Sequence, residues 1–137
     1  MKTALPIDRP VQLAQDMETT TFENVDLTLH ELYAHAARKG SYMLKGLTFK
    51  GCRIQGPGVM LVGTGVTFDD SNFGDSRGDI RNLVMRPAGD KAVGTVPVFD
   101  CAFQGCEFYY VGFTGHPAFI EQLLSLSDAP ASVGGAA

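Results

Sequence analysis

The chain has 137 residues, of which 45% are hydrophobic and 19% charged, and its formal net charge is −4. This length and composition predict one globular domain with a single core and exclude a disordered chain. The mild negative charge lacks the basic footprint of a nucleic-acid-binding protein, so nucleic acid is not an expected partner.

No apolar run approaches the roughly 20 residues of a membrane-spanning helix, and the first residues, MKTALPIDRPVQ, lack the apolar core of a signal peptide. We therefore expect a cytoplasmic protein with no membrane partner. The three cysteines, Cys52, Cys101 and Cys106, form no C-x-x-C pair. They predict reduced thiols, with a Cys101–Cys106 disulfide as the alternative.

The N-terminal 44 residues predict an arm followed by a helix. Residues 1 to about 20 contain Pro6 and Pro10 and show little apolar periodicity, which indicates an extended arm. From residue 29 apolar residues follow a helical stripe: Leu29, Leu32, Tyr33, Ala36 and Ala37. Thr28 and Glu31 have the spacing of a capping box, and Gly40 suits the end of this helix.

A five-residue pattern dominates residues 45–116. Each unit has a large apolar centre, and a small or medium apolar residue lies two places before most centres. The centres are Phe49, Ile54, Val59, Phe68, Phe73, Val98, Phe103, Phe108 and Phe113, and Phe22 and Leu27 echo the same spacing. The inward partners include Leu47, Cys52, Pro57, Val96, Cys101, Cys106 and Val111. This spacing fits neither a helix nor a simple strand.

The distances between units predict how they stack. Phe49 and Phe68 are 19 residues apart, and Phe68 and Phe108 are 40 apart. Because four units of five make 20, the units superpose on coils of about 20 residues, as in solenoid proteins. This arithmetic predicts that Phe49, Phe68 and Phe108 occupy equivalent positions in the stack, with one residue missing from the first coil and one degenerate coil between those of Phe68 and Phe108.

The units VDLTL, CAFQG, CEFYY and SNFGD resemble those of the pentapeptide-repeat family, and the resemblance covers about half of the chain. It implies a mainly β fold, a short right-handed parallel β-helix in residues 45–116. An antiparallel β-sandwich is the alternative. Residues 1–44 and the helix predicted in 117–137 would cap the two ends within one domain, and the tail from Ser127 is expected to be disordered.

The repeat is weakest from Gly74 to Gly94, where we expect a protruding loop that contains a buried strand near Ile80, Leu83 and Met85.

Catalytic and metal-binding patterns are missing from the sequence. His30, Glu31 and His35 do not meet the H-E-x-x-H spacing of zinc enzymes, and His116 suits the start of a helix. We therefore expect no cofactor and no metal, and an enzyme is the less favoured reading.

Three aromatic residues are the candidate partner-binding residues. Phe99, Tyr109 and Tyr110 follow centres of the repeat, at positions that should face solvent, with the two tyrosines on one side and Phe99 on another. Exposed aromatic residues are enriched at protein interfaces. The sequence thus predicts a non-catalytic protein-interaction or regulatory module that binds a protein partner. The alternatives are a self-associating structural protein, which would be a homo-oligomer, and an enzyme with an unrecognised site.

Overall fold

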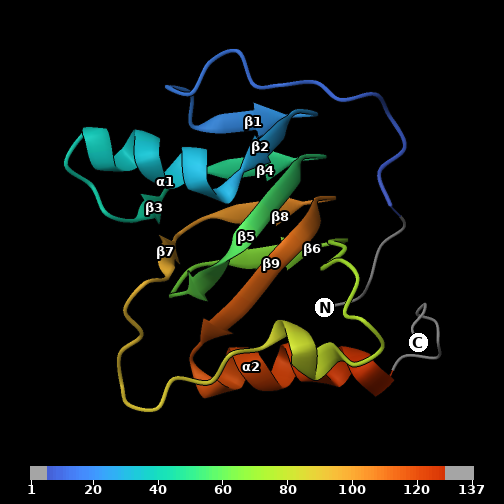
Figure 1. Cartoon of the computed structure of the whole chain (residues 1–137). Helices are drawn as coiled ribbons and strands as arrows, with labels where there is room; N and C mark the ends of the chain where they lie inside the picture. Colours follow the sequence, from blue (N-terminus) through green and yellow to red (C-terminus); the bar gives the residue numbers. More distant parts are fainter. Residues whose placement is uncertain (1–5, 129–137) are drawn as a thin grey trace.

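The computed structural model describes residues 6–128 and shows a small α/β protein (Figure 1). Its two α-helices are α1 (Leu29–Arg38) and α2 (Pro117–Leu124), with 3₁₀ helices η1 (Ile80–Leu83) and η2 (Ser125–Asp128). The strands are β1 (Thr21–Glu23), β2 (Asp26–Thr28), β3 (Leu44–Lys45), β4 (Thr48–Lys50), β5 (Arg53–Val62), β6 (Thr67–Asp69), β7 (Val96–Phe99), β8 (Ala102–Gln104) and β9 (Glu107–Gly115).

The strands form two sheets, and every strand pair within residues 6–128 is parallel. The four-stranded sheet has the order β1-β4-β8-β6. In the five-stranded sheet the order is β2-β5-β7-β3, and β9 pairs with β5 as well. Neighbours in the first sheet are therefore not in chain order, because β8 lies between β4 and β6.

The prediction of a β-helix solenoid is wrong, and so is the alternative of an antiparallel sandwich. The chain is an α/β protein with two parallel sheets and two α-helices. A solenoid stacks its repeats in chain order, whereas here Phe103 is the register partner of both Phe49 and Phe68. The spacing of five identifies side chains that point inward, but it does not determine which strands become neighbours.

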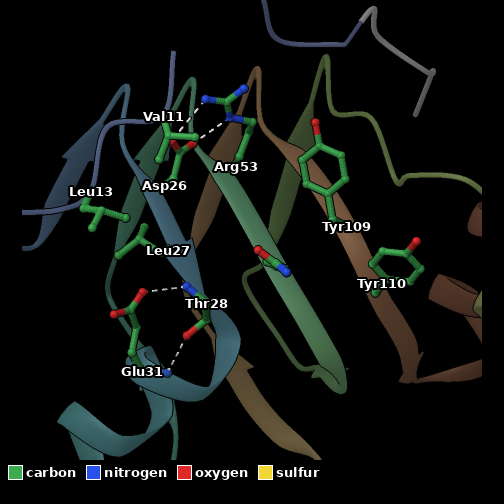
Figure 2. Close-up of a pocket in the computed structure, with 10 residues that line it drawn as sticks. Val11, Leu13, Asp26, Leu27, Thr28, Glu31, Arg53, Tyr109 and Tyr110 are labelled. Carbon is green, nitrogen blue, oxygen red and sulfur yellow. Dashed lines mark hydrogen bonds and ion pairs between the residues drawn. The ribbon is translucent and has the colours of Figure 1, made fainter. Parts of the chain in front are cut away.

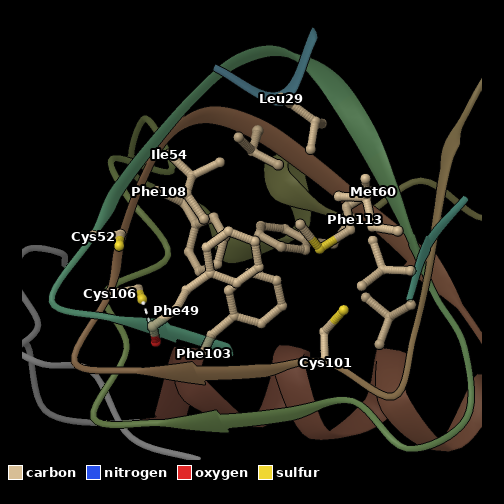
Figure 3. Packing of buried hydrophobic residues seen from close by; sticks show 14 of the residues in the cluster. Leu29, Phe49, Cys52, Ile54, Met60, Cys101, Phe103, Cys106, Phe108 and Phe113 are labelled. Carbon is tan, nitrogen blue, oxygen red and sulfur yellow. Dashed lines mark hydrogen bonds between the residues drawn. The ribbon is translucent and has the colours of Figure 1, made fainter. Parts of the chain in front are cut away.

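A column of stacked phenylalanine rings lies on the inner face of the four-stranded sheet, and Figure 3 labels two of these rings, Phe49 and Phe103. Phe22 stacks on Phe49 with centroids 5.2 Å apart, Phe49 on Phe103 at 4.9 Å, and Phe103 on Phe68 at 5.1 Å. Phe119 of α2 continues the column, 5.8 Å from Phe68. In-register parallel strands place identical side chains one above another, so the rings add stacking energy to the burial of apolar area.

Most predicted centres are buried, and Phe68 and Val59 are the exceptions, both half-buried. Phe49, Ile54, Phe108 and Phe113 are fully buried. Val59 is only half-buried and Pro57 is exposed, so their predicted inward positions are wrong. The register between β5 and β9 shifts after Gln55, and this irregularity makes Met60 the inward residue opposite Phe113.

Small side chains line the bend between the two sheets. Four of these side chains form a row across neighbouring segments, in which each lies opposite the next: Val25, Cys52, Cys106 and Ser71. Three of them donate hydrogen bonds to a carbonyl of the next segment. Cys52 Sγ donates to Phe22 O at 3.4 Å, Cys106 Sγ to Phe49 O at 3.3 Å, and Ser71 Oγ to Phe103 O at 3.4 Å.

Both helices begin and pack as the sequence predicts. Thr28 Oγ1 accepts a hydrogen bond from Glu31 N, and Glu31 Oε1 accepts one from Thr28 N, which completes the capping box. The inner faces bury Leu29 and Leu32 in α1 and Ile120 and Leu123 in α2. Helix α2 lies beneath the strands in Figure 1, and the arm passes above them.

The segment 74–94 forms no buried strand. Residues Ile80–Leu83 form the 3₁₀ helix η1, capped by Asp79, whose carboxylate accepts a hydrogen bond from Arg81 N. Leu83 is buried, and Val84 makes an isolated bridge to Phe113. The predicted disorder of the tail falls largely on residues 129–137, which lie outside the described residues.

Candidate functional site

A groove lies between the N-terminal arm, the start of α1, and the outer faces of β2, β5 and β9 (Figure 2). We call it the tyrosine groove. Its volume is about 380 Å³, and it is lined by Val11, Leu13, Asp26, Leu27, Thr28, Glu31, Arg53, Gln55, Tyr109 and Tyr110. Four of these side chains are large and exposed: Val11 (73%), Leu13 (64%), Tyr109 (36%) and Tyr110 (69%).

The bulge between β5 and β9 explains why two consecutive tyrosines are exposed. In a regular strand successive side chains point to opposite faces. Opposite Tyr110, β5 has two residues, Gly56 and Pro57, and Tyr110 has a left-handed backbone with φ of 54°. Gly56 permits this close approach, because a Cβ there would lie 1.9 Å from Tyr110 O. Tyr110 therefore leaves the inward position that alternation would give it.

Ion pairs fix the arm to the floor of the groove. Asp26 accepts hydrogen bonds from Arg53 Nε at 2.7 Å, from Gln12 N at 2.7 Å and from Arg9 Nη1 at 3.2 Å. Arg9 also donates to the carbonyls of Val25 and Gly51. Burial favours a higher pKa for Asp26, but these donors outweigh it and lower the pKa from 3.8 to about 2. Asp26 is therefore ionised at neutral pH.

Glu107 of β9 lies opposite Arg53, beneath the groove, and Tyr109 lies two residues further along β9. Glu107 is 5% exposed, and its Oε1 accepts a hydrogen bond from Ile7 N at 2.8 Å. Burial and then the hydrogen bond with Glu107 raise the pKa of Tyr109, against the opposite effect of Arg53. The Tyr109 hydroxyl consequently stays protonated and can donate a hydrogen bond at neutral pH.

The structure brings Tyr109 and Tyr110 together and leaves Phe99 elsewhere. Phe99 is half-buried and lines a second, larger cavity with the end of β5 and the start of α2. Its ring packs over Gly63, where a Cβ would come within 2.2 Å of Phe99 Cε1. The aromatic candidates therefore belong to two surfaces.

Sequence reasoning missed the part of the site that the arm contributes. Val11 and Leu13 show no periodicity that would mark them, and Asp26 and Arg53 meet only through the pairing of β2 with β5. One signal was present in the sequence: Gly56 and Gly58 flank a proline inside an otherwise apolar strand, a pattern typical of a bulge.

Two of the three histidines have local roles. His35 Nε2 pairs with Glu18 at 3.1 Å, and Lys39 Nζ pairs with the same carboxylate. His116 is the N-cap of α2, and its Nδ1 accepts a hydrogen bond from Ala118 N. In the part of the chain that the structure describes, no group of three or more His, Cys, Asp or Glu could hold a metal ion.

No family model, no curated protein and no solved structure matches this chain. The resemblance to pentapeptide-repeat proteins stays a prediction, although the β-helix that it implies is wrong. Within residues 6–128, no helix is long and apolar enough to span a membrane.

Proposed function

We propose that this protein is a non-catalytic binding module, and that the tyrosine groove takes an extended, electrically neutral peptide segment of a protein partner. The observation that carries this proposal is the exposure of Tyr109 and Tyr110 side by side on a bulged strand. Tyrosine supplies a large contact area with little loss of conformational entropy, which is why it is frequent at binding hot spots.

The backbone of Tyr110 supports this proposal. A bulky residue with a positive φ is rare, because the left-handed conformation costs about 1–2 kcal/mol for any residue that carries a Cβ. Tyr110 has a φ of 54° and is 69% exposed as a residue, so little burial compensates for this cost. Strain of this kind is concentrated at functional sites.

The charges around the groove favour a neutral occupant. Asp26 and Glu31 of the lining are acidic, and the guanidinium groups of Arg9 and Arg53 both pair with Asp26, so little net charge faces the groove. Specificity must then come from the two rings, the apolar side chains of Val11 and Leu13, and the exposed amide of Gln55. Aromatic grooves of this type bind extended, proline-containing segments, whose backbone carbonyls stay free to accept hydrogen bonds.

A peptide-display selection against the wild-type protein tests the proposal. We expect enrichment of neutral peptides rich in proline and aliphatic residues. The double variant Tyr109→Ala/Tyr110→Ala should bind them more than tenfold more weakly, since anchor residues contribute about 2 kcal/mol or more. The matched control is Tyr42→Ala, which removes a ring that is 64% exposed outside the groove.

Two outcomes would contradict the proposal: no enriched peptide, or peptides that bind the double variant as tightly as the wild type. Light scattering on the same proteins separates a partner from self-association. A wild-type dimer that the double variant loses would mean that a second copy of the chain occupies the groove.

A further inference from the structure

Two of the three buried thiols lie directly opposite each other. Lys50 pairs with Gln104 and Arg53 with Glu107, which places Cys52 opposite Cys106 on neighbouring parallel segments. The bond from Glu107 N to Cys52 O, 2.9 Å long, fixes this register. In Figure 3 the two sulfurs lie on the same side of the core, away from Cys101.

The spacing of the two segments suits a covalent link. Neighbouring strands lie about 4.7–4.9 Å apart, and the Cα atoms of disulfides are about 4.4–6.8 Å apart. Cys106 Sγ already points toward the segment of Cys52, because it donates to Phe49 O. Cys52 Sγ points the other way, toward Phe22 O, so closing the bond requires a rotation about χ1 of Cys52 and the loss of that weak hydrogen bond.

We propose that Cys52 and Cys106 are a peroxide-sensitive thiol pair that closes to an intramolecular disulfide. This modification site is independent of the tyrosine groove. Cys101 has no thiol opposite it, since its segment pairs with those of Leu47 and Val66. The pair also differs from the Cys101–Cys106 link that sequence spacing suggests.

The reaction proceeds in two balanced steps. The Cys52 thiolate attacks one oxygen of hydrogen peroxide, which forms a sulfenic acid and releases hydroxide. The Cys106 thiolate then attacks the Cys52 sulfur, the S–S bond forms, and a second hydroxide leaves. The two hydroxides take up the two thiol protons, so two thiols lose two electrons and hydrogen peroxide is reduced to two water molecules. A small oxidant is required, because both sulfurs are buried.

The electrostatics of the pair favour Cys52 as the first thiolate. The neighbouring Cys106 thiol, and to a smaller extent the positive charge of Arg9, lowers the pKa of Cys52 below its ordinary value, against the effect of burial. The same neighbourhood and burial raise the pKa of Cys106, because a negative charge on Cys52 disfavours a second one beside it. Burial raises the pKa of Cys101, which makes it the matched control.

The test is mass spectrometry of the folded full-length protein after incubation with hydrogen peroxide. We expect the loss of two hydrogen atoms from the intact mass and, in a non-reducing digest, a peptide pair that links Cys52 to Cys106. Cys101→Ser should form the same link. Cys106→Ser should instead leave a sulfenic acid on Cys52, which dimedone traps when the oxidised protein is unfolded in its presence, since Cys52 is buried in the folded protein. Serine is tolerated in this row, since Ser71 occupies the position opposite Cys106.

The proposal is overturned if the folded wild-type protein forms no Cys52–Cys106 link under these conditions, or if the link that forms involves Cys101 or a second molecule. If Cys106→Ser does not fold, the digest of the wild-type protein and of Cys101→Ser decides the question alone.

Discussion

Tyr110 combines a left-handed backbone with an exposed aromatic side chain. The guanidinium carbon of Arg77 lies 5.9 Å from the centroid of its ring, while its φ of 54° suits glycine. The side chain is therefore retained at a cost to stability, which is expected of a residue that binds something.

We predict that Tyr110→Gly is more stable than Tyr110→Ala by about 1 kcal/mol, because both remove the ring but only glycine relieves the left-handed strain. Chemical denaturation of the two variants measures this difference. In the binding assay the two variants should be equally weak. Equal stability of the two would show that the backbone at this position is not strained.

At the scale of elements, one carboxylate links the arm to two strands. Asp26 joins β2 to β5 through Arg53 and to the arm through Arg9 and Gln12. Since its pKa in the folded protein, about 2, is below its ordinary value of 3.8, its contribution to stability is present above pH 4. That contribution is lost as the pH falls from about 4 to 2.

We predict that Asp26→Asn lowers the free energy of unfolding at pH 6 by at most about 2 kcal/mol, a shift of this size being partly screened by water. The difference between wild type and variant should shrink toward zero at pH 2. Denaturation at a series of pH values measures it. Asp8→Asn, which removes an equal charge from an exposed position of the arm, is the control. A constant difference across this pH range would show that Asp26 acts by packing alone.

The sequence predicted the elements unevenly, for physical reasons. Helix α1 and its capping box are local features, so Thr28 and Glu31 were sufficient to locate it. The buried centres were also largely correct, because burial follows from the order of residues along each short strand. The predicted inward position of Val59 was wrong because the bulge in β5 depends on pairing with β9, which is about 50 residues away in the sequence.

At the scale of the whole molecule, the order of strands is the property that the sequence did not predict. The five-residue spacing predicted that Phe68 and Phe108 occupy equivalent positions in the stack. In the structure β6 pairs with β8, and the register partner of Phe68 is Phe103. The repeat predicted that the two tyrosines of the groove face solvent. It did not predict the arm that completes the groove, because ion pairs between distant residues hold the arm in place.

This strand order predicts the behaviour of a truncated chain. A solenoid that stacks its coils in order tolerates removal of its last coils. Here β8 separates β4 from β6, and β9 covers the edge of β5. We predict that a fragment of residues 1–94 has no cooperative thermal transition by circular dichroism, although it retains both Phe49 and Phe68. A cooperative transition in this fragment would mean that β4 and β6 can pair without β8.

The position of β8 also affects synthesis in the cell. Strands β4, β5 and β6 emerge from the ribosome before the segment that must lie between and beside them. At about 5–20 residues per second, the roughly 45 residues from the end of β6 to the end of β9 take about 2–9 seconds. During that interval Phe49, Ile54 and Phe68 lack the partners that β8 and β9 supply, so the nascent chain exposes apolar strands to other nascent chains. We therefore expect the chain to depend on chaperones during translation, because β8 comes late in the sequence but lies between β4 and β6.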